Sequence, residues 1–197
     1  MRLISFIVLA QVFCCVAPSQ TATQQDRTIT STITPKHSPR SLPEMTAQSA
    51  VIVIGTCERE LPARFFVPAN PKADTVTDRI VRVTSALKGD LEAGARIAVE
   101  QLGGTIPSAD GIHTVTKTIV HQAPLQPTSS YVLFLRPESQ TVGDAFDGKR
   151  YVVTGEWAGV FAVVNGRIRA SEAAEPVIEQ LTGLSVADVV ALIQKSQ

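Results

Sequence analysis

Residues 78–104, DRIVRVTSALKGDLEAGARIAVEQLGG, predict the fold of this chain. They contain two stretches typical of β-strands, joined by a short polar connection with glycine. In the second stretch Ile97 and Val99 alternate with polar or small neighbours, the period of two expected for a strand with one buried and one exposed face. The first stretch, residues 80–87, is rich in β-branched side chains, which favour strands. A mainly β protein built around this pair is therefore expected.

Further strands are predicted on both sides of this pair. The dipeptide Asn165-Gly166, between VFAVV and RIRA, is the signal of a two-residue type I′ hairpin. Gly103-Gly104 is interpreted as a bend or bulge, because no phosphate-loop lysine follows it. Apolar or β-branched runs that predict other strands are residues 50–58, 112–120, 131–135 and 151–154. The total is seven or eight strands.

Short helices are expected at the two ends of this β region. Ser41 and Glu44 have the spacing of a capping box, which predicts a helix through Gln48. Pro176 suits the start of a second helix and Gly183 its end. Ser185 is placed to cap a last helix, whose apolar stripe would be Val189, Leu192 and Ile193. We expect a small antiparallel closed barrel or sandwich with a short leading helix and two C-terminal helices.

The charge balance limits the classes of partner. The chain has 18 lysine and arginine residues against 18 aspartate and glutamate residues, and aromatic residues make up only 5%. A neutral surface provides no general attraction for nucleic acid, and the aromatic platforms that single strands require are few. Arg79, Arg82 and Lys88 are interpreted as the exposed face of a strand rather than as a binding groove. We therefore expect no nucleic-acid partner, and no motif in the sequence calls for a cofactor.

The first residues have the layout of an export signal. Arg2 is followed by an apolar run and then by small residues, so cleavage is expected after Ser19. The predicted location is periplasmic or extracellular. Two alternatives remain open: the segment could stay uncleaved as an anchor, or a lipid could be attached to Cys14 or Cys15. Membrane association is expected only in those two cases.

The predicted organisation after the signal is a tether and one domain. Residues 20–40 consist largely of Thr, Ser, Gln and Pro, with few large apolar side chains, which predicts a disordered tether. Residues 41–197 then form a single domain with one sizeable core. Cys57 is the only cysteine beyond the predicted signal, so the domain cannot contain an internal disulfide.

Three stretches resemble a known family. The runs AVIVIG at residues 50–55, ALKGD at 86–90 and YVLFL at 131–135 occur in this order in netrin/TIMP-like modules. They are also similar to bacterial exported domains of uncharacterised role. The resemblance covers residues 45–169 and implies an OB-like closed barrel. Inhibitory TIMP members carry a disulfide-bonded cysteine at the mature N-terminus, which is absent here, so protease inhibition is not implied.

An enzymatic alternative rests on three residues, His113, His121 and Cys57. The two histidines flank one predicted strand, and imidazole is a common metal ligand. However, eight positions of a strand span about 26 Å, which is too far for one ion. Cys57 follows a buried strand and has no catalytic signature around it, so a small buried hydrophobe is the favoured interpretation. An exported hydrolase or metal-dependent enzyme is therefore the second hypothesis.

The favoured hypothesis is an exported non-enzymatic domain that binds a protein or a cell-envelope component. Possible contact residues are Trp157, which lies between glycines, and the adjacent Phe65 and Phe66. For Trp157 a position capping the core is slightly favoured over an exposed one. The third hypothesis is a purely structural envelope protein.

Overall fold

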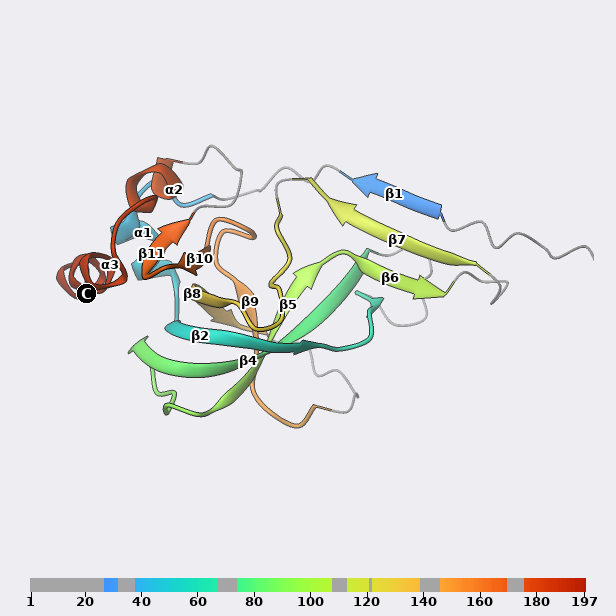
Figure 1. Ribbon diagram of the computed structural model, residues 1–197, viewed down its shortest axis with the longest axis horizontal. Helices are drawn as coiled ribbons and strands as arrows, with labels where there is room; N and C mark the ends of the chain where they lie inside the picture. Colours follow the sequence, from blue (N-terminus) through green and yellow to red (C-terminus); the bar gives the residue numbers. More distant parts are fainter. Residues whose placement is uncertain are drawn as a thin grey trace, which may run out of the picture.

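A computed structural model of the 197-residue chain describes residues 27–31, 38–66, 74–107, 113–120, 122–138, 146–169 and 176–197 (Figure 1). The predicted signal, residues 1–19, lies outside these ranges, as does His121.

Eleven strands and three helices occur in the described residues. The strands are β1 (Arg27–Ser31), β2 (Val51–Glu60), β3 (Arg64–Phe65), β4 (Thr75–Lys88), β5 (Arg96–Leu102), β6 (Gly104–Pro107), β7 (Thr114–Ile119), β8 (Ser130–Pro137), β9 (Arg150–Val153), β10 (Val160–Val164) and β11 (Arg167–Arg169). The helices are α1 (Leu42–Gln48), α2 (Pro176–Leu181) and α3 (Val186–Lys195).

Five strands close into a barrel, which confirms the prediction of a small β-barrel. The strands pair in the order β8-β2-β4-β5-β9, and β8 also pairs with β9, so the ring returns to its start. Four of the five pairings are antiparallel, whereas β5 and β9 run parallel. A closed ring leaves none of these five strands as a free edge. The sandwich alternative is therefore wrong.

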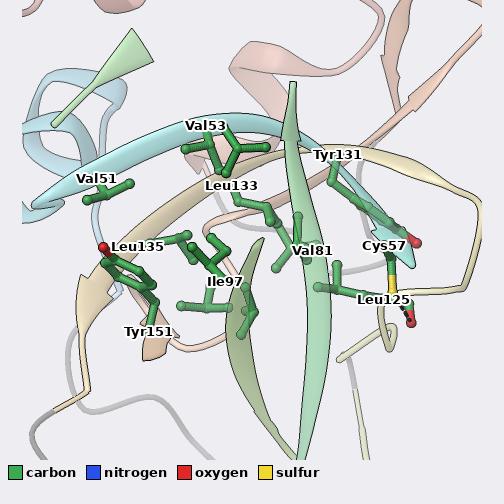
Figure 2. Packing of buried hydrophobic residues seen from close by; sticks show 14 residues of the cluster. Val51, Val53, Cys57, Val81, Ile97, Leu125, Tyr131, Leu133, Leu135 and Tyr151 are labelled. Atoms are coloured by element: carbon green, nitrogen blue, oxygen red, sulfur yellow. Dashed lines mark hydrogen bonds between the residues drawn. The ribbon is translucent and has the colours of Figure 1, made fainter. Parts of the chain in front are cut away.

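The barrel interior is filled by aliphatic side chains (Figure 2). Ile97 and Val99 point into it, as the alternation in β5 predicted. Arg79 was expected on the exposed face of β4, but it is buried at 6% exposure. Its guanidinium donates to Gln101 Oε1 and Glu60 Oε2, at 3.0 and 2.7 Å. A buried arginine held in this way shows that β4 has no fully exposed face near this end.

The helices cover a second core on the outside of the barrel. In Figure 1 they gather at the end opposite to the three-stranded sheet. Phe134 of β8 and Phe161 of β10 meet edge to face there, with ring centroids 5.8 Å apart. Helix side chains that pack on this face include Met45, Val177, Ile178, Leu181, Val189 and Ile193. Leu192 was expected in the same stripe but is 38% exposed, because the buried face of α3 is narrower than predicted.

Local signals placed the helix ends and one hairpin correctly. Ser41 and Ser185 cap α1 and α3, accepting hydrogen bonds from the backbone amides of Glu44 and Asp188. Asn165 and Gly166 join β10 to β11 with φ values of 51° and 73°. These are the positive angles that a type I′ turn requires, and glycine adopts them without steric cost.

A second sheet, which we call the arm, projects from the barrel (Figure 1). Its strands have the order β1-β7-β6, and β1 runs parallel to β7. The chain enters the arm at Gly103-Gly104, where φ is 95° and 130°. A Cβ on Gly103 would lie 2.8 Å from the carbonyl oxygen of Lys117, so only glycine permits this close corner.

The arm corrects the prediction of a disordered tether over residues 20–40. Residues 27–31 form strand β1, which pairs with the edge of β7. Its central residues, Thr-Ile-Thr, are all β-branched, which favours a strand. Pro39 is buried, so the domain also begins earlier than residue 41. Residues 20–26 and 32–37 lie outside the described ranges.

Candidate functional site

The outer face of the barrel carries two arginines on neighbouring strands. Arg82 of β4 lies directly opposite Arg96 of β5 in the antiparallel register. Two like charges in this position repel one another and destabilise a sheet unless an anion compensates them. Glu58 of β2 provides that anion.

A β-bulge places Glu58 between the two arginines. The pairing of β2 with β4 shifts register between Cys57 and Arg59, so Glu58 is the extra residue of the bulge. Its Oε1 accepts from Arg82 Nε, and its Oε2 accepts from Arg96 Nε at 2.8 Å. These hydrogen bonds, that from Arg82 first, hold the pKa of Glu58 below its ordinary value despite some desolvation. Glu58 is therefore ionised at neutral pH.

A groove of about 650 Å³ lies beside this charged group, and we call it the arginine groove. Ile80 and Phe146 supply apolar lining, while Arg59 and Arg96 supply positive charge. The remaining lining residues are Thr56, Cys57, Glu58 and Thr128. The volume of the arginine groove exceeds those of two other hollows on the described surface, which measure about 200 and 210 Å³.

The charge of the arginine groove is positive. Arg59 and Arg96 line the groove, and Arg82 adjoins it through its ion pair with Glu58. These three arginines outnumber the one lining carboxylate, Glu58, so the four side chains together leave two positive charges. Arg59 is exposed and has no ion-pair partner among the residues that the structure describes. The adjoining residues 147–149 carry one acid and one lysine, whose charges offset each other. A local positive field thus exists on a chain whose net charge is zero.

A buried ion network underlies the same face of β4 and β5. Arg64 donates to Asp78 Oδ2 at 3.3 Å and to Glu100 Oε2 at 2.6 Å, and Arg150 also donates to Asp78. Asp78 and Glu100 are register partners and are only 2% and 9% exposed. Burial outweighs the contact with Arg64 and raises the pKa of Glu100. The outer face was predicted to be exposed, but here it is a sealed polar layer.

The network contacts both the arginine groove and a second hollow. The Arg150 guanidinium lies over the ring of Phe146, 5.7 Å from its centroid, and Phe146 lines the arginine groove. On the other side Glu100 lines a hollow of about 200 Å³ together with Phe66, Glu138 and residues of β5, β8 and β9. The network thus fixes the positions of residues in both hollows.

The three predicted contact residues are not brought together. Trp157 is buried at 4% exposure, so its proposal as a surface contact is wrong and the core position is confirmed. The turn around it, with Glu156 at φ 62°, folds the indole inward. Phe65 lies in β3 opposite Thr75 and is half-buried. Phe66 lines the smaller hollow, which leaves it available to a ligand there.

The residues of the enzymatic hypothesis do not form a constellation in the described structure. The Cys57 thiol is fully buried and donates to the carbonyl oxygen of Leu125, 3.8 Å away. Burial raises its pKa, which lowers the thiolate fraction that a nucleophile needs. His113 is half-buried just before β7, and His121 lies outside the described residues. Within the described ranges, no group of three or more His, Cys, Asp or Glu side chains is arranged to hold a metal.

Sequence reasoning missed Glu58, Arg59 and Arg96 as a group. Arg82 was interpreted only as part of the exposed face of a strand. The signal that could have found the group is the run Cys-Glu-Arg-Glu at the end of β2, where the apolar alternation breaks down. A break of this kind is typical of a bulge.

Two comparisons with known proteins found no match for the chain. No family model matches the chain, and no curated protein matches it. Among the described helices, none is both long enough and apolar enough to cross a membrane.

Proposed function

We propose that the chain is an exported, non-enzymatic binding domain with an OB-like barrel of the netrin/TIMP-like kind. Its partner is a protein that places an acidic, extended segment in the arginine groove. The observation that carries the proposal is the excess of arginine around a groove of about 650 Å³ on the described surface.

The lining of the arginine groove supports a polypeptide occupant. The groove is open, and residues of β2, β4 and β5 contribute to a lining that combines an aliphatic side chain, an aromatic ring and charged groups. The half-buried Phe146, which packs on the buried Ile80, provides apolar contact area, while the arginines select for carboxylates. Arginine is also the cation most enriched at the energetically important positions of protein interfaces.

The chemistry of the site supports binding rather than catalysis. The charged groups around the groove are arginines and a carboxylate paired with them, and none of these is poised to exchange a proton near neutral pH. Glu58 is held ionised, and Cys57 is held as a buried thiol. Both pKa directions move these groups away from the values that acid–base or nucleophilic catalysis requires.

Fluorescence anisotropy with labelled peptides tests the binding proposal. The probe is a fluorescein-labelled decaglutamate peptide, with decalysine and a glycine-serine decapeptide as controls. We expect binding of decaglutamate only, weakening as NaCl is raised, because exposed charges are screened. Arg59→Ala and Arg96→Ala should each weaken binding about three- to tenfold, the range for a truncated interface arginine.

Arg169→Ala is the matched control for these variants. Arg169 is exposed on β11 and does not line the groove. The Arg169→Ala variant therefore removes the same charge at a distant position. Equal losses for Arg169→Ala and Arg59→Ala would mean that binding follows net charge, which would overturn the proposal. Stronger binding of a sulfated glycan than of decaglutamate would replace the protein partner with an envelope polysaccharide.

A reporter fusion tests export. Residues 1–40 joined to alkaline phosphatase without its own signal should give activity outside the cytoplasm, because that enzyme requires oxidation of its cysteines there. Activity equal to that of the signal-less phosphatase would overturn the export part of the proposal and leave the binding part intact.

A further inference from the structure

We infer that Glu58 is an internal occupant of the arginine groove. Its carboxylate holds, from within the chain, the position that a carboxylate of the partner takes on binding, and it thereby sets the affinity. This inference rests on the proposed function, since it concerns the same groove and the same acidic partner.

The contacts of Glu58 are those expected of an acidic ligand. Each of its two carboxylate oxygens accepts from a different guanidinium, Oε1 from Arg82 and Oε2 from Arg96. The side chain is partly exposed, at 23%, so it can leave without opening the barrel. The arginines are 52% and 58% exposed, and a partner can therefore reach both of them from solvent.

The two guanidinium groups have unused donors. Each is held by Glu58 through Nε alone, and the terminal nitrogens of Arg82 and Arg96 make no hydrogen bond within the described part of the chain. Arginine prefers to bind a carboxylate through two parallel N–H groups. A partner carboxylate can offer that geometry, whereas Glu58, fixed on the bulge, contacts each arginine at a single point.

Charge gives the direction of the effect. With Glu58 in place, a partner carboxylate that approaches Arg82 and Arg96 meets a like charge beside them. Binding then requires either that Glu58 moves away or that the repulsion is tolerated, and both lower the affinity. Removing this one negative charge should therefore strengthen the binding of acidic segments, although it weakens the hydrogen bonding of Arg82 and Arg96 in the free protein.

Glu58→Gln tests the inference with the same decaglutamate probe. Gln has the shape of Glu and keeps an acceptor for one arginine, but it lacks the charge. Since exposed ion pairs make modest contributions, loss of the competing charge should tighten binding about three- to tenfold. Glu58→Asp, which keeps the charge, should stay close to the wild-type affinity.

Glu179→Gln is the control for the change in net charge, because Glu179 is exposed on α2 among the helices that cover the other core. Its affinity for decaglutamate should equal that of the wild type. Thermal melts of all variants verify that they are folded. Weaker binding by Glu58→Gln would show that Glu58 braces the arginines, which overturns the inference.

The failures of the two proposals are distinguishable. If the wild type binds decaglutamate and Glu58→Gln binds it no more tightly, the inference that Glu58 occupies the groove is wrong, and the proposed binding function stands. If neither protein binds, both are wrong. Equal tightening in Glu58→Gln and Glu179→Gln would assign the effect to net charge and would also reject the role of Glu58.

Discussion

Asp78 and Glu58 are two carboxylates on one face of the barrel that differ mainly in burial. Each accepts hydrogen bonds from two arginines. Asp78 is 2% exposed, whereas the Glu58 side chain is 23% exposed. Water can replace the partners of Glu58, whereas the Asp78 carboxylate is closed to water. The two ion pairs of Asp78 should therefore contribute much more to stability than the two ion pairs of Glu58.

Asp78→Asn should lower the free energy of unfolding by about 3–5 kcal/mol, the range for breaking a buried ion pair. The reason is that Arg150, which is 9% exposed, and the partly exposed Arg64 would both lose their shared anion. Glu58→Gln should cost less than about 1 kcal/mol, as exposed pairs do. Urea denaturation at pH 7 measures both. Similar costs for the two variants would contradict the sealed layer over β4 and β5.

At the scale of elements, the arm and the barrel should differ in stability. The side chains of residues 27–30 are largely exposed, and β1 adds to the arm by pairing with β7 alone among the described strands. The barrel strands, in contrast, enclose a continuous apolar core. Elements with few buried contacts open at lower free energy than core strands.

Removal of residues 20–31 should therefore loosen the arm without unfolding the barrel. In hydrogen exchange, peptides of β7 should exchange faster, because its amides lose the cover of β1, while peptides of β2 and β8 should not change. The global free energy of unfolding should fall by less than about 1 kcal/mol, since few apolar groups are uncovered. Faster exchange throughout the barrel would mean that β1 supports the main core.

The elements that sequence reasoning found are those with local causes. The caps at Ser41 and Ser185, the turn at Asn165-Gly166 and the apolar alternation in β5 depend on neighbours along the chain. The strand β1 was missed because its stability comes from β7, which lies far away in sequence. A short Thr-Ile-Thr alternation beside a run of polar residues does not indicate such a partner.

The candidate site was not predictable for the same reason. Arg82, Arg96 and Glu58 belong to three strands, and they meet only because of the register of β4 with β5 and the bulge in β2. No local pattern specifies either. Arg79 was placed on the wrong side of β4 because its charge was taken to imply exposure. In the structure Gln101 and Glu60 accept hydrogen bonds from the buried Arg79 guanidinium. The core position was correctly favoured for Trp157, but the residues beside it in the sequence could not distinguish a buried from an exposed indole.

At the scale of the whole molecule, two carboxylates give stability opposite dependences on pH. Burial raises the pKa of Glu100 above the ordinary 4.5, so its contribution to stability is lost as pH rises from 4.5 through the raised value. Hydrogen bonds from Arg82 and Arg96 lower the pKa of Glu58, so its contribution is present above 4.5 and is lost as pH falls below it.

Urea midpoints measured between about pH 3 and 7 separate the two groups, since a change in proton binding on folding appears as a slope in stability. Glu100→Gln should flatten the decline of the urea midpoint above pH 4.5, because the buried side chain can no longer ionise. Glu58→Gln should flatten the rise of the urea midpoint with pH below pH 4.5. If Glu100→Gln left the upper slope unchanged, Glu100 would have to be ionised without cost in the folded state.

The closure of the barrel also has a consequence for how the chain is made. Strand β2 is synthesised early, but it pairs on one side with β8, and the ring closes only when β9 follows. A nascent chain that ends after β5 thus presents β2 and β5 as apolar strands with unpaired edges. Pairings between distant segments form slowly, and such edges are prone to aggregate. The protein therefore completes its fold only after synthesis of residue 153, and until then its strands need shielding.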